Sequence, residues 1–211
     1  MLNYDEEIRR NLSVTVTDNR EKYRYEGCCK KTYGNLLILP QYKLNNSEDK
    51  HPVSLNVQTN VLQMTTDEII ALGMKNTLIA DYRICELSKV VNARIGIEHF
   101  EPSPFLLVKG ENIATALLMP SELKKISHKI EEDTFYLVCL SPHELLVVSM
   151  SDVDDVQDFE KILRLITEDD EVIIYDIYGF DGERLYAVKT NTLEEIVPPQ
   201  VLKRMNNGGR K

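Results

Sequence analysis

The sequence lacks the short motifs that identify most enzymes and metal-binding proteins. Its 211 residues contain no phosphate-binding loop, no glycine fingerprint for dinucleotides and no nucleophile motif in a supporting context. The cysteines do not form two pairs at metal-ligand spacing, and the histidines are far apart in the chain: His51, His99, His128 and His143. We therefore expect no cofactor and no structural metal, and the sequence alone assigns no activity.

Long apolar runs are also missing. No segment approaches the roughly 20 apolar residues that span a bilayer, and the first seven residues have neither the basic start nor the apolar stretch of a signal peptide. Two cysteines, Cys28 and Cys29, are adjacent, and Cys85 and Cys139 lie in apolar runs, as is typical of small buried residues rather than of a disulfide framework. These features indicate a cytoplasmic protein without a membrane partner.

Basic residues are outnumbered, with 25 Lys and Arg against 34 Asp and Glu and a formal charge of −9. Such a field repels polyanions, so we do not expect nucleic acid as a partner. The hydrophobic fraction of 43% is enough to bury a core. Residues 199–211 contain basic and glycine residues and are interpreted as a flexible tail.

Three regions are expected: an irregular, tyrosine-rich lobe over residues 1–60, an α+β domain over 61–198, and the tail. Thr65 and Glu68 form a capping box, which predicts a helix that starts there and ends near Asn76-Thr77. Residues 55–62 are consistent with either a further strand or an extended connector, and residues 79–91 have a weak helical pattern.

Residues 105–188 have the clearest pattern. It predicts hairpins at 105–119, 134–149 and 171–188, with helices near 120–131 and 152–166. The first hairpin is expected to turn at Gly110 and the last at Asp181-Gly182, whereas Pro120 and Ser151 mark the helix starts. The predicted class is α+β, a mainly antiparallel sheet made from repeated β-β-α units with both helices on one face.

Residues 65–165 carry a resemblance to a known family. Its elements are the apolar strand and turn before Ala114-Thr115-Ala116-Leu117-Leu118, the segment Met119-Pro120-Ser121-Glu122-Leu123-Lys124, and the strand that runs into Ser141-Pro142-His143-Glu144. Together they resemble the bacterial family catalogued as domain of unknown function 5688. That family has no assigned activity, so the resemblance implies a bacterial intracellular protein and no reaction.

One string places a hydroxyl, an imidazole and a carboxylate close together: Ser141, His143 and Glu144. These are the residue types of a catalytic triad, but on a strand Glu144 points away from the other two. We interpret Ser141-Pro142 as a turn or bulge, with His143 and Glu144 bonding backbone groups. The alternative is a small hydrolase that uses His143 with acidic residues from elsewhere in the fold.

Tyrosine is concentrated near the N-terminus, where five of the ten tyrosines lie within the first 42 residues. Tyrosine contributes large contact area at low entropic cost, which is typical of protein interfaces. The alternative is packing with the hydroxyls at the rim of a β layer. The hypothesis that follows is a non-enzymatic interaction module whose partner is another protein, with the contacts made by Tyr23, Tyr25, Tyr33 and Tyr42.

Overall fold

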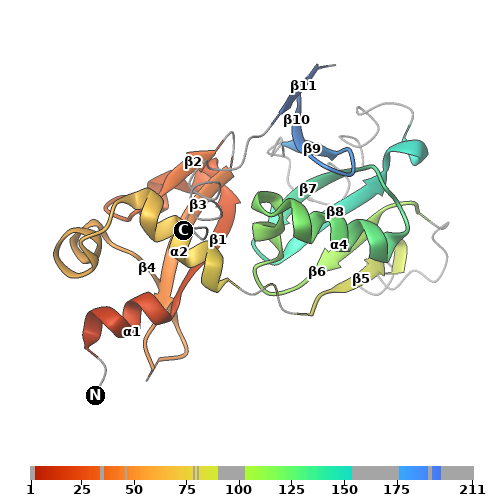
Figure 1. Cartoon of the computed structure of the whole chain (residues 1–211). Helices are drawn as coiled ribbons and strands as arrows, with labels where there is room; N and C mark the ends of the chain where they lie inside the picture. Colours follow the sequence, from red (N-terminus) through yellow and green to blue (C-terminus); the bar gives the residue numbers. More distant parts are fainter. Residues whose placement is uncertain are drawn as a thin grey trace, which may run out of the picture. The chain divides into compact units, whose positions relative to one another are not determined.

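The computed structural model describes residues 3–33, 36–45, 47–77, 79, 81–89, 103–153, 176–189 and 192–195. They form two compact units that divide after Ile79, and each is described by itself (Figure 1). The boundary expected at residue 60 falls inside the first unit, because the helix that follows it packs on strands of that unit. The predicted tail lies outside the described residues.

The first unit contains, in the described ranges, a four-stranded antiparallel sheet. Its strands are β1 (Leu12–Asp18), β2 (Lys31–Tyr33), β3 (Leu36–Lys43) and β4 (Lys50–Pro52). β3 is central, since it pairs with β1 over its length and with both β2 and β4. The expected irregular lobe is therefore a regular sheet, built by pairing two apolar runs whose paired residues are 18 to 30 positions apart in the chain.

Four helical segments surround this sheet in the part of the chain described: α1 (Tyr4–Arg10), the 3-10 helix η1 (Asn19–Tyr25), the π-helix η2 (Val57–Leu62) and α2 (Thr66–Asn76). The predicted capping box is confirmed. The Thr65 hydroxyl accepts from the Glu68 amide at 3.3 Å, and the Glu68 carboxylate accepts from the Thr65 amide at 2.8 Å. Both expectations for residues 55–62, a strand or an extended connector, are wrong, because this segment is helical.

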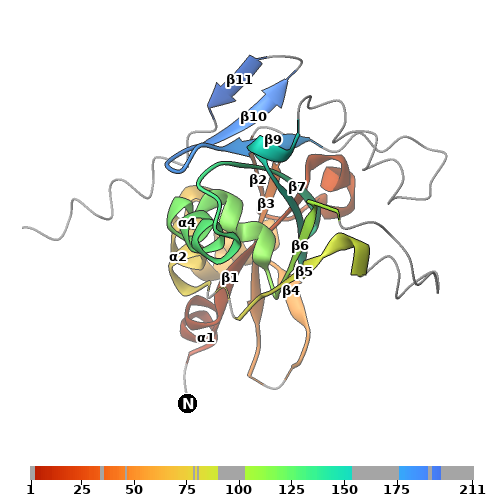
Figure 2. The same cartoon turned by 90° about the vertical axis from the view of Figure 1, so that its right-hand side faces the viewer.

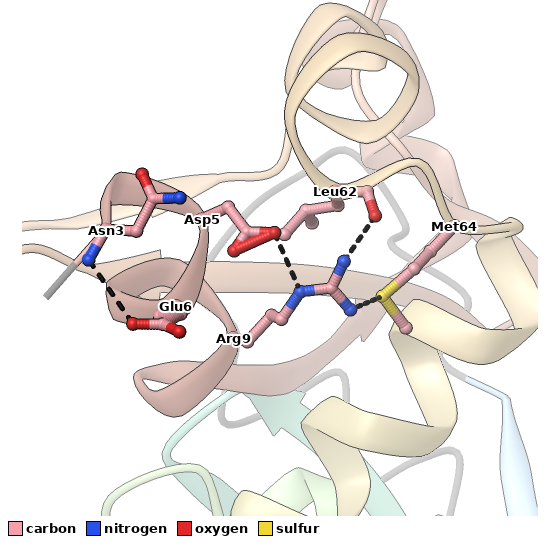
Figure 3. A network of polar contacts seen from close by, with 6 residues as sticks. All are labelled: Asn3, Asp5, Glu6, Arg9, Leu62 and Met64. Carbon is pink, nitrogen blue, oxygen red and sulfur yellow. Dashed lines mark hydrogen bonds and ion pairs between the residues drawn. The ribbon is translucent and has the colours of Figure 1, made fainter.

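Side chains from outside the segment stabilise the wide turn of η2 (Figure 3). The Arg9 guanidinium donates to the Leu62 carbonyl at 2.6 Å and contacts the Met64 sulfur at 2.9 Å, and its Nε pairs with Asp5 at 3.2 Å. Since these contacts join α1 to η2 across about fifty residues of chain, the local sequence pattern of residues 55–62 did not show them.

Helix α2 lies directly against β1 (Figure 1). The Thr77 hydroxyl donates to the Gly73 carbonyl at 2.7 Å and accepts from the Val14 amide at 2.8 Å, so the end of the helix satisfies a backbone group of the strand. A Cβ at Gly73 would lie 2.7 Å from Val14 Cγ2 and 3.0 Å from the Ser13 carbonyl oxygen. The absence of a side chain at Gly73 is what permits this approach.

The second unit contains a seven-stranded sheet in the order β11-β10-β9-β7-β8-β6-β5, with every described pair antiparallel. Figure 2 shows β11 at one end and β5 at the other. The strands are β5 (Arg83–Glu86), β6 (Leu106–Lys109), β7 (Phe135–Ser141), β8 (Glu144–Ser149), β9 (Ile177–Phe180), β10 (Leu185–Lys189) and β11 (Thr192–Glu195). The α+β class and the hairpin at 134–149 are confirmed, as is the final hairpin over its described residues 177–188.

The hairpin predicted at 105–119 is wrong. Residues Ile113–Leu118 form the 3-10 helix η3, and β6 pairs with β5 and β8 instead. All six residues of η3 are buried, so the segment has no exposed face and lacks the alternation of a half-buried strand. The weak helical pattern at 79–91 is corrected in part, because residues 83–86 form β5, whereas residues 87–89 are helical.

Helix α4 (Pro120–Ile130) matches the prediction for residues 120–131, with Leu123 and Ile126 buried. The helix expected at 152–166 lies almost entirely outside the described residues, which end there with the short 3-10 turn η4 (Met150–Asp152). All four apolar residues of β8, Leu145 to Val148, are fully buried, so both faces of the sheet are covered at this strand. In the described part of the chain, no helix has the length and apolar character to cross a membrane.

Candidate functional site

The Ser-Pro-His-Glu string forms the turn of the β7–β8 hairpin. Ser141 and Glu144 are paired across the two strands, next to a register shift between Cys139 and Ser141, and Pro142 and His143 are the turn residues. The strand alternation that separated Glu144 from the other two side chains therefore does not apply, since His143 lies in a turn. The Ser141 hydroxyl accepts from the His143 amide at 3.2 Å, a contact that closes the turn.

The candidate catalytic side chains bond to groups other than the side chain of the next triad member, and the partner of the Ser141 hydroxyl is the backbone amide of His143. His143 is exposed, and its Nδ1 accepts a hydrogen bond from the Asn112 amide at 3.3 Å. Glu144 forms an ion pair with Lys109 at 2.7 Å. Pro142 and His143 also accept from the amides of Ala114 and Gly110 through their carbonyls. These contacts fasten the hairpin turn to the end of β6 and the start of η3, as a structural corner does.

The four tyrosines named from the sequence have different environments. Tyr42 is 8% exposed, belongs to the core of the first unit and packs its ring 6.0 Å from that of His51. Burial raises the pKa of Tyr42, and a hydrogen bond with Tyr4 raises it further. Tyr25 is half-buried, and the side chain of Tyr33 lies outside the described set. Tyr23, in contrast, is 72% exposed.

The segment that presents Tyr23 is held in place by the fold. The Lys30 ammonium donates to the carbonyls of Lys22 and Tyr25, at 2.9 Å each, and thereby satisfies carbonyl groups in the second half of η1. Lys22 Nζ lies 5.2 Å from the centroid of the Tyr23 ring, within the range of a cation–π contact. The exposed residues Lys22, Tyr23 and Arg24 thus project from an anchored helix.

A second exposed apolar residue adjoins this segment. Leu55 is 51% exposed, and its amide donates to the Gly27 carbonyl at 2.8 Å, beside an isolated bridge between Cys28 and Ser54. These backbone contacts join η1 to the start of η2. We call the exposed residues of the two segments the Tyr23 surface: Lys22, Tyr23, Arg24, Glu26, Gly27 and Leu55.

The patterns in the sequence did not indicate that Leu55, Lys22 and Arg24 belong to one surface. The Lys-Tyr-Arg string was a usable signal, because tyrosine and arginine are both enriched at interfaces. The sequence around Leu55 contained no such signal, because the contact of Leu55 with Gly27 joins residues 28 positions apart in the chain. Cys29, two residues after Gly27, is buried in the core of the first unit, and burial raises the pKa of its thiol while a hydrogen bond with Thr66 opposes the rise. A buried thiol of raised pKa is a core residue rather than a nucleophile.

A polar cluster in the second unit surrounds Tyr82. Lys129 Nζ lies 3.7 Å from the centroid of its ring, and a Cβ at Gly110 would be 2.8 Å from Tyr82 Cβ. The Tyr82 hydroxyl is buried and has no hydrogen-bond partner among the described residues. Burial raises the pKa of this hydroxyl, and the negative charge of Glu122 raises it further.

Metal ligands do not gather in the described ranges, where no group of three or more His, Cys, Asp or Glu side chains is placed to hold an ion. The four cysteines are free thiols. Searches of protein-family models, of curated proteins and of solved structures each found no match to the chain.

Proposed function

We propose that this chain is a non-enzymatic, cytoplasmic protein-interaction module that binds another protein through the Tyr23 surface. The observation that supports it most is the exposure of Tyr23, 72%, on a helix fastened by Lys30. An exposed tyrosine on a preorganised segment contributes contact area without the cost of ordering a loop. Leu55, 51% exposed beside Gly27, extends the apolar area.

The three other tyrosines named from the sequence have a smaller place in this proposal. Tyr42 packs in the core of the first unit, whereas Tyr25 lies half-buried at the end of η1. Membership of the bacterial family that residues 65–165 resemble remains a prediction. The hydrolase alternative gains no support from His143, whose Nδ1 is already occupied by the Asn112 amide and whose neighbour Glu144 is paired with Lys109.

Site-specific photo-crosslinking in the native host tests the proposal. A photoreactive amino acid at position 23 is expected to capture a discrete protein, because the position is exposed at the centre of the surface. Positions 124 and 143 serve as matched controls, since both are exposed in the second unit. Crosslinking that is absent at position 23, or the same at all three positions, would refute the proposed surface.

A further inference from the structure

The segment that carries the Tyr23 surface is basic within an acidic protein. Between Arg20 and Lys31 there are five basic and two acidic residues, whereas the whole chain has a formal charge of −9. Two of these cations are used inside the fold: Lys30 caps η1, and Lys31 pairs with Asp67 at 2.6 Å. Lys22 and Arg24, the residues before and after Tyr23 in the chain, are both exposed.

This placement limits the kind of partner that fits. An exposed aromatic residue whose two neighbours in the chain are cations offers apolar contact together with carboxylate recognition. Charge complementarity of this kind steers association and rejects partners of the same sign. Nucleic acid also carries negative charge, but it would have to approach a molecule whose total charge is −9, and its backbone contacts need many cations.

We infer that the Tyr23 surface binds an acidic protein segment, one with carboxylates on both sides of an apolar residue that packs on Tyr23 and Leu55. This inference rests on the proposed function and adds the chemistry of the partner. Glu26, also exposed on the surface, would repel such a segment, so its charge is expected to weaken binding.

Selection from a random peptide library tests the inference. The full chain is the bait, and a K22E/Y23A/R24E variant removes peptides that bind elsewhere. All three replaced side chains are exposed, and thermal unfolding checks that the variant is folded. The enriched peptides are expected to be acidic with an apolar residue among the acids. Enrichment of neutral or basic peptides would overturn the inference.

The best synthetic peptide is then titrated with single variants by fluorescence anisotropy. Tyr23→Ala is expected to weaken binding by about 30-fold, as for a central interface tyrosine. Lys22→Glu and Arg24→Glu should also weaken it, by a factor that shrinks as salt rises, and Glu26→Gln should strengthen it. Lys43→Glu is the control, because this exposed residue lies opposite Lys50 in the β3–β4 pair and outside the surface.

The outcomes separate the inference from the proposed function. If peptide binding needs Tyr23 but ignores the charges at positions 22, 24 and 26, the acidic partner is wrong and the interaction surface stands. If no peptide is enriched and position 23 captures no protein, both fail. Tighter binding of a single-stranded RNA oligonucleotide than of any peptide, lost in Tyr23→Ala, would replace the inferred partner with nucleic acid.

Discussion

Replacing Gly73 with alanine tests the close contact between α2 and β1. The new Cβ would lie 2.7 Å from Val14 Cγ2, and Val14 is a fully buried, β-branched residue that has little room to turn away. It would also lie 3.0 Å from the Ser13 carbonyl oxygen, which belongs to the backbone. The helix must therefore move outward, which strains the hydrogen bond between the Val14 amide and the Thr77 hydroxyl.

Three effects set the change in the free energy of unfolding, two of them destabilising and one stabilising. Overpacking of this kind costs roughly 1–3 kcal/mol, and the loss of a good hydrogen bond adds about 1 kcal/mol. Alanine has a higher helix propensity than glycine, and this offsets about 1 kcal/mol of the destabilisation. We expect Gly73→Ala to lower the free energy of unfolding by about 1–3 kcal/mol, whereas Lys75→Ala, at an exposed position of the same helix, should change it by less than about 0.5 kcal/mol.

Urea unfolding followed by circular dichroism measures both variants. Gly73→Ala is also measured in a Val14→Ala protein, which completes a double-mutant cycle. Because Val14 Cγ2 is then absent, Gly73→Ala should lower the free energy of unfolding by less, with a coupling energy of about 0.5–3 kcal/mol. A Gly73→Ala protein that is more stable than the parent, by about the 1 kcal/mol of helix preference, would refute the close approach of α2 to β1.

Three further predictions concern single contacts. Thr65→Ala should cost about 1 kcal/mol of stability by removing the helix cap. Hydrogen bonds from the Thr65 backbone amide and from its hydroxyl hold the pKa of Glu68 below its usual 4.5, and the variant keeps the first and loses the second. The stabilising effect of the hydroxyl bond is present above pH 4.5 and is lost as the pH falls through the lower folded-state pKa, so the stability difference should shrink in acid, which melting curves at several pH values would show or contradict. His143→Ala should cost only about 0.5–1.5 kcal/mol in chemical denaturation, because an exposed imidazole gives up a single bond to Asn112, and a loss of partner binding at matched folding would instead make this turn a site. Tyr82→Phe should leave the melting temperature unchanged or raise it, since the hydroxyl is buried without a described partner, and a clear drop would reveal a hydrogen bond there.

Local signals in the sequence predicted local structure well. The capping box at Thr65, the proline at the start of α4 and the hairpin around residues 141–144 depend on contacts within a few residues, and the structure has all three. The failures depend on distant contacts. The sheet of the first unit requires Leu12 to pair with Tyr42, and η3 is buried on every side, so its sequence has no periodicity that distinguishes a helix from a strand.

The candidate surface was also predictable only in part, because some of its features depend on local composition and others on distant contacts. Tyrosine content indicated the right region and included Tyr23, but exposure is a property of the folded chain, and it separates Tyr23 from Tyr42. Leu55 enters the surface through a backbone hydrogen bond to Gly27, which no pattern in the sequence encodes.

Hydrogen exchange of the complex with the protein captured at position 23 tests the central claim most directly. Each backbone amide is compared in the free and the bound chain, which locates the contact without any substitution. The Tyr23 surface predicts slowed exchange over residues 19–27 and at the start of η2, with no change across the β7–β8 turn. Protection confined to residues 139–145 would contradict the claim and would make the Ser-Pro-His-Glu turn the functional site.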